Sequence, residues 1–113
     1  MLEHLGRRSG QVRYVCLEIV TQPRPGEIVI VSGFGERAQW YRNLRAHPEC
    51  KVSIGRRVGV AATARLMDAA ESHDALEAYK REHPRAWRRL RGMIEQAIGS
   101  PVTELPMVAL TVH

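Results

Sequence analysis

The clearest hydrophobic pattern in the chain is an alternation of apolar and polar residues between Lys51 and Leu66. Val52 and Ile54 fall on one side of the first segment. In the second segment the alternating residues are Val58, Val60, Ala62, Ala64 and Leu66. A period of two is typical of a β-strand with one buried face. Because Gly55-Arg56-Arg57 separates the segments, we predict a hairpin of Lys51–Gly55 with Val58–Leu66.

Other apolar runs predict four more strands and three helices. The strands are expected at Leu2–Leu5, Val12–Val20, Glu27–Ser32 and Leu105–Val112, with a turn at Gln22–Gly26. A helical period predicts helices at Arg37–His47, from the capping residue Asp68 to His83, and from Pro84 to the stop at Gly99. This order indicates an α+β fold with antiparallel pairing dominant, and a length of 113 residues indicates one domain over residues 1–113.

The charged residues are biased toward arginine. Lys and Arg total 17 against 12 acids, for a net charge of +5, and all but two of these cations are Arg. Arginine favours planar, bidentate recognition of phosphate and carboxylate. An anionic partner is therefore expected, and the charge alone leaves a nucleic acid, an acidic membrane and a phosphorylated cofactor as alternatives.

The cellular compartment is predicted from two absences. The chain has no apolar run long enough for a membrane helix and no signal-peptide pattern at its N-terminus. We therefore expect a cytoplasmic protein in which Cys16 and Cys50 are reduced thiols.

Several kinds of catalytic site are not supported. Ser32 has no His or acid at the spacing of a hydrolase nucleophile. His47, His73 and His83 lack metal-ligand spacing, so no metal site is expected. Paired carboxylates and a Walker loop are also missing. Because no set of residues can store two electrons, redox chemistry would require a cofactor.

Two motifs resemble a known family. Gly6-Arg7-Arg8-Ser9-Gly10-Gln11-Val12-Arg13 is similar to its G-R-[RK]-S-G-x-x-R loop. Ser32-Gly33-Phe34-Gly35, followed by Trp40-Tyr41-Arg42-Asn43-Leu44-Arg45-Ala46-His47-Pro48, is similar to its W-Y-x-N-L-x-A-x-P helix. In order and spacing the chain resembles the deazaflavin-dependent nitroreductases. That resemblance implies coenzyme F420 and a split antiparallel β-barrel like that of pyridoxamine phosphate oxidases, with short flanking helices.

The resemblance also implies roles for particular residues. Those expected to hold the phosphate and glutamate tail of F420 are Arg7, Arg8, Ser9, Gly10 and Arg13. Those expected near the deazaflavin ring, or in the helix wall that positions the loop, are Ser32, Gly33, Trp40, Tyr41 and Asn43. A missing side chain at Gly33 would allow the ring to approach closely. Ser32 and Tyr14 are the candidate proton donors for catalysis.

The expected activity is hydride transfer from reduced deazaflavin to an electron-poor small molecule: a quinone, an enone or a nitro compound. One alternative is an FMN- or FAD-binding protein on the same barrel. Another is a non-enzymatic basic nucleic-acid-binding module, although the basic residues are not interleaved with aromatics, so no specific nucleic acid is expected. The Arg85–Arg91 cluster is interpreted as a solvated helix face, with an extension of the tail groove or a peripheral membrane contact as alternatives. The chain is expected to be a monomer or a homodimer.

Overall fold

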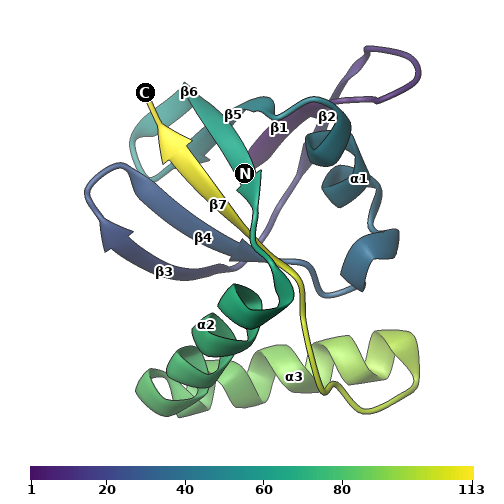
Figure 1. The fold of residues 1–113 in the computed structure, drawn as a ribbon, viewed down its shortest axis with the longest axis vertical. Coiled ribbons are helices and arrows are strands. Elements are labelled where there is room, and N and C mark those ends of the chain that lie inside the picture. Colours follow the sequence, from purple (N-terminus) through teal and green to yellow (C-terminus); the bar gives the residue numbers. More distant parts are fainter.

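The computed structural model describes residues 1–113 and contains one curved sheet with three α-helices (Figure 1). The strands are β1 (Leu2–Leu5), β2 (Val12–Val15), β3 (Ile19–Arg24), β4 (Glu27–Val31), β5 (Glu49–Ile54), β6 (Arg57–Leu66) and β7 (Met107–Val112). The helices are η1 (Gly35–Arg37, a 3-10 turn), α1 (Gln39–Ala46), α2 (Ala69–Glu82) and α3 (Pro84–Ile98). The strand order is β2-β1-β5-β6-β7-β4-β3, and every pair is antiparallel.

The two edges of this sheet, β2 and β3, are consecutive in the chain. Only Cys16–Glu18 separates them. A link of that length spans at most about 14 Å between the Cα atoms of Val15 and Ile19. The sheet must therefore curl until its edges lie close, yet no ladder joins them. This is the expected split antiparallel barrel. The prediction of one strand over Val12–Val20 is wrong, because the chain crosses from one sheet edge to the other within it.

Three other boundaries differ from the sequence prediction. Strand β3 runs on through Pro23, which an edge strand tolerates because the missing N–H faces no partner, so the turn is confined to Pro25 and Gly26. The helix expected over Arg37–His47 begins only at Gln39, because Ala38 has extended backbone angles (φ −57°, ψ 133°). The last strand begins at Met107 rather than Leu105.

The predicted hairpin and the two long helices are confirmed. In the β5–β6 pair, Val52 lies opposite Val60 and Lys51 opposite Ala61. Asp68 caps α2 through a reciprocal capping box with Glu71. Helix α3 starts at Pro84, and Gly99 ends it in the left-handed conformation (φ 73°).

The structure has two hydrophobic cores on opposite faces of the sheet. In β4, Ile28 and Ile30 point into the barrel, whereas Val29 and Val31 belong to the second core beneath α2 and α3. That double burial explains the continuous Ile-Val-Ile-Val run, since a strand covered on both faces has no polar side. Helix α1 closes the barrel with Leu44, which is fully buried. None of the helices has both the length and the apolar character needed to cross a membrane.

Candidate functional site

The arginine-rich loop between β1 and β2 is closed by its own backbone. The Gly6 amide donates to the Gln11 carbonyl at 2.8 Å, and the Gly10 amide donates to the Gly6 carbonyl at 2.8 Å. Gly10 has a φ of 70°, which favours glycine. At Gly6 an added Cβ would lie 2.7 Å from Ser9 Oγ, so a larger residue would force the Ser9 side chain to move. The two glycines thus hold the intervening residues at the tip of the loop.

This loop forms an open groove of about 380 Å³ with the first turns of α1. The lining residues are Gly6, Arg7, Arg8, Ser9, Arg13, Gln39 and Asn43, and none is hydrophobic. No carboxylate is among them, and no Asp or Glu forms an ion pair with Arg7, Arg8 or Arg13. Three arginines in one groove without a negative partner create a positive site suited to phosphate or carboxylate.

Asn43 is a buried residue of the groove, and its side chain binds Arg7. Its Oδ1 accepts from the Arg7 amide at 3.1 Å and from Arg7 Nη1 at 2.9 Å. Nη1 of Arg7 also donates to Gln39 Oε1 at 2.8 Å. These bonds hold the Arg7 guanidinium in place and leave its other N–H groups free for a ligand. Because the Arg7 amide donates to Asn43, the loop amides without a protein partner are those of Arg8 and Ser9.

The other end of the Asn43 amide contacts a buried histidine. Asn43 Nδ2 lies 3.0 Å from His4 Nδ1. His4 is on β1, and only 4% of its surface is exposed. Burial, and secondarily the positive charge of Arg13, hold the pKa of His4 below its ordinary value. His4 is therefore a neutral imidazole at physiological pH.

A second, larger cavity of about 900 Å³ adjoins the groove, and the two share Arg13 and Gln39. It is mostly apolar, with 12 hydrophobic residues among the 18 that line it. Its walls come from β1, β2, the Cys16–Glu18 link, the end of β4, η1, α1 and α3. Among the lining side chains are Val12, Tyr14, Leu17, Phe34, Trp40, Leu90, Met93 and Ile94.

The turn after β4 forms part of the wall of this apolar cavity. Ser32 is fully buried, and its hydroxyl donates to the Gly35 carbonyl at 2.6 Å. Gly33 lies in the cavity wall, but an added Cβ would lie 3.1 Å from Ile94 Cγ1. The close neighbour of Gly33 is therefore helix α3, which was not expected from the sequence.

The structure separates the predicted site residues into groups. Arg7, Arg8, Ser9 and Arg13 meet Asn43 in the groove, while Trp40 and Tyr14 line the apolar cavity. Tyr41 packs edge-on against Trp40, with ring centroids 6.0 Å apart, and lines neither space. Gly10 and Ser32 are also absent from both linings. Gly10 has the left-handed backbone conformation that closes the loop, and the Ser32 hydroxyl bonds within the turn after β4.

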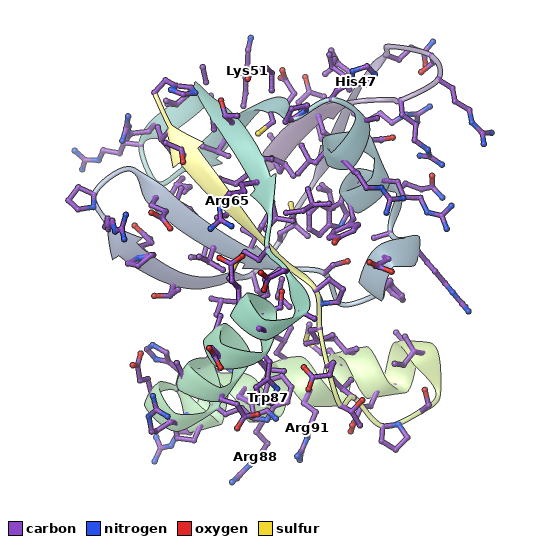
Figure 2. The ribbon with its side chains drawn as sticks, viewed as in Figure 1. His47, Lys51, Arg65, Trp87, Arg88 and Arg91 are labelled. Atoms are coloured by element: carbon purple, nitrogen blue, oxygen red, sulfur yellow. The ribbon has the colours of Figure 1, made fainter.

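The arginine cluster of α3 lies elsewhere. No residue of Arg85–Arg91 lines the groove, and Leu90 is its one contribution to the apolar cavity. Arg88 and Arg91 are exposed and point away from the barrel (Figure 2). The interpretation as a solvated helix face is thus supported, whereas an extension of the groove is not.

Sequence reasoning missed three contributors to this region: His4, Gln39 and the inner face of α3. His4 shares the inward face of β1 with Leu2, and a histidine at an inward strand position was the available signal. Gln39 lies next to the motif beginning at Trp40. Nothing in the sequence near α3 indicates that it packs against the turn at Gly33.

Comparisons with known proteins agree with this geometry. A curated relative, a putative F420H(2)-dependent quinone reductase of Mycobacterium tuberculosis, is 39% identical over 57 residues, which cover 49% of this chain and 47% of that protein. The chain thus matches about half the length of this relative. A solved F420-H2-dependent reductase has a TM-score of 0.62 at 21% identity, over 96% of this chain and 90% of that one. A structure described as a domain-swapped dimer has a TM-score of 0.65 at 22% identity, and the match covers 96% of this chain and 76% of that one. At these identities the two structures establish the fold alone.

The family model for F420H(2)-dependent quinone reductases matches residues 1–96, which include the loop and every lining residue of the groove and of the apolar cavity. This match confirms the resemblance to deazaflavin-dependent reductases and the expectation of coenzyme F420. It does not favour the FMN or nucleic-acid alternatives. The chain belongs to the F420H(2)-dependent quinone reductase family.

Proposed function

We propose that this chain binds coenzyme F420 across the two adjoining cavities and reduces a quinone. The observation that carries the proposal is the cluster of Arg7, Arg8 and Arg13 in a groove without any carboxylate. F420 carries a phosphodiester and a tail of glutamates, and planar guanidinium groups bind both anions well. The groove fits the anionic half of the cofactor.

The apolar cavity fits the other half. A flat deazaflavin ring needs an apolar space with few polar contacts, and about 900 Å³ lies within the usual range of ligand sites. Because the groove and the cavity share Arg13 and Gln39, one ligand could extend from one space into the other. Trp40 would form a rigid wall for the ring, since its side chain is buried and packed against Tyr41.

The cofactor, when bound and reduced, supplies the hydride, and the protein stores no electrons itself. The role of the chain is to hold the anionic end, orient the ring and keep water from its reacting face. Exposed Phe34 and Met93 lie at the cavity edge, where they would contact an apolar acceptor. A quinone suits this lining better than a charged acceptor does. Enones and nitro compounds have similar shape and polarity and remain in the proposed substrate class.

A proton for the reduced acceptor would come from solvent or from Tyr14. Tyr14 lines the cavity and is exposed, so its hydroxyl is accessible. Ser32, the other candidate donor, is fully buried, and its proton is engaged with Gly35. We therefore assign Ser32 to holding the turn and keep Tyr14 as the candidate donor.

The test is a fluorescence titration of the purified protein with F420 and, separately, with FMN. FMN also has a phosphate but lacks the glutamate tail, so it would use fewer of the arginine contacts. Each well-made charge-assisted hydrogen bond contributes about 1.5–3 kcal/mol, so we expect F420 to bind at least about tenfold more tightly. Reduced F420 should then be oxidised on addition of a soluble benzoquinone. Equal or stronger binding of FMN would contradict the proposal and favour a flavin protein.

A further inference from the structure

The buried histidine on β1 lies where the groove meets the apolar cavity. His4 lines the apolar cavity, and its Nδ1 contacts Asn43, which lines the groove. Arg13, which belongs to both spaces, is directly opposite His4 in the β1–β2 ladder. His4 thus lies between a residue of the groove, Asn43, and a residue that both spaces share, Arg13.

The hydrogen bonds around Asn43 determine where the His4 proton sits. The backbone amide and guanidinium of Arg7 can only donate, so the side-chain atom of Asn43 that faces Arg7 must be its oxygen. The NH₂ group of Asn43 then faces His4 Nδ1, which must accept. A neutral imidazole that accepts at Nδ1 carries its proton on Nε2.

That second nitrogen has no partner within the protein. No hydrogen bond to His4 Nε2 occurs, and no buried side-chain nitrogen or oxygen in the structure is both enclosed and unpaired. Nε2 therefore retains some accessible surface, although only 4% of the surface of His4 is exposed. We infer that this surface faces the apolar cavity, because His4 is one of the residues that line it.

We propose that His4 is a cofactor-binding residue, whose Nε2–H donates a hydrogen bond to an oxygen of the segment that joins the ring of F420 to its phosphate. This inference rests on the proposed function. In F420 that segment is a ribityl chain, and its hydroxyl oxygens are good acceptors for a neutral N–H donor. Asn43 links this contact to the groove, since the same amide positions Arg7 on one side and His4 on the other.

Two variants of His4 separate this role from a purely structural one. In His4→Asn, an amide oxygen can take the place of Nδ1 and accept from Asn43, but nothing reaches the position of Nε2. In His4→Gln, the amide nitrogen reaches the position of Nε2, but the acceptor for Asn43 is lost. A structural role requires the Nδ1 contact, whereas ligand binding requires the Nε2 donor.

The affinity for F420 is measured by fluorescence titration, and thermal unfolding is followed in parallel. We expect His4→Asn to melt close to the wild-type temperature but to bind F420 about threefold to tenfold more weakly, the range for one neutral hydrogen bond. His4→Gln should be the less stable variant and the tighter binder of the two. If His4→Asn binds as well as the wild-type chain, the contact does not exist. If the wild-type chain fails to bind F420 at all, the proposed function falls together with this contact.

A second measurement needs no cofactor. Nitrogen-15 NMR of the free protein distinguishes a protonated Nε2 from a protonated Nδ1 through the chemical shifts of the ring. We expect the Nε2–H tautomer at neutral pH, and we expect Asn43→Asp, which places a second acceptor against Nδ1, to change that signature. An Nδ1–H tautomer or an imidazolium in the wild-type protein at neutral pH would overturn the inference.

Discussion

The two adjoining cavities differ both in their chemistry and in how the chain builds them. The groove is lined by seven residues without a hydrophobic side chain, and five of these fall between Gly6 and Arg13. The apolar cavity is lined by 18 residues, of which 12 are hydrophobic, drawn from β1, β2, the Cys16–Glu18 link, the end of β4 and the turn after it, α1 and α3. One is thus mainly the product of a short loop, whereas the other is the product of the whole fold.

This difference follows from the physics of the two kinds of recognition. An anion site needs a few long cationic side chains on a loop of defined shape, and adjacent residues can supply them. An apolar site needs surfaces that face one another, and those come from elements distant in sequence. A change in the loop should therefore act locally, whereas a change in α3 or in the turn after β4 should alter the cavity and the packing together.

The largest effect is expected at the buried base of the groove. Replacing Asn43 with Leu removes the partner of the Arg7 amide and of His4 Nδ1, and leaves the Arg7 guanidinium with Gln39 alone. Buried groups left without partners cost about 1–3 kcal/mol each, so we expect the free energy of unfolding to fall by about 2–4 kcal/mol in urea denaturation.

Gln39→Leu is the matched control, because Gln39 also bonds to Arg7 but is exposed. Its cost should stay within about 0.5 kcal/mol, as for most surface substitutions. Equal costs for the two variants would show that the Asn43 network does not support the fold.

A smaller effect is expected in the wall of the apolar cavity. In Gly33→Ala the added Cβ would lie 3.1 Å from Ile94 Cγ1, so the Ile94 side chain must give way by a few tenths of an ångström. We expect a loss of about 1 kcal/mol in the free energy of unfolding, typical of mild overpacking.

Gly92→Ala, on the same helix but with no atom near the added Cβ, is the matched control. It should increase the free energy of unfolding by about 0.5–1 kcal/mol, because alanine favours a helix. A gain in stability for Gly33→Ala as well would mean that the turn and α3 are not closely packed.

The contrast between the cavities also explains what the sequence could predict. The residues of the Gly6–Arg13 motif lie together in the groove, because a closed loop keeps its residues together whatever surrounds it. The β5–β6 hairpin and the capping box at Asp68 were equally predictable, since each depends on residues near in sequence.

The other features of the fold and the site could be found only from the tertiary structure. No local signal in the apolar run from Val12 to Val20 marks the crossing between sheet edges at Cys16–Glu18. The neighbour of Gly33 is Ile94, which lies 61 residues further along the chain. His4 is connected to the groove by its hydrogen bond to Asn43, and the apolar pattern of a strand cannot indicate such a contact.

The central claim is that one cofactor spans both cavities, with its anionic end held by the loop. The most direct test compares two ligands, F420 and a deazaflavin–ribitol fragment without phosphate or glutamates, on three forms of the protein. These are the wild type, Arg7→Ala/Arg8→Ala, and Arg88→Ala/Arg89→Ala, whose side chains lie outside the groove. We predict that the first double variant binds F420 at least about tenfold more weakly but binds the fragment as the wild type does, and that the second changes neither. An equal loss of F420 affinity in both double variants, or an equal loss for both ligands in the first, would contradict the account.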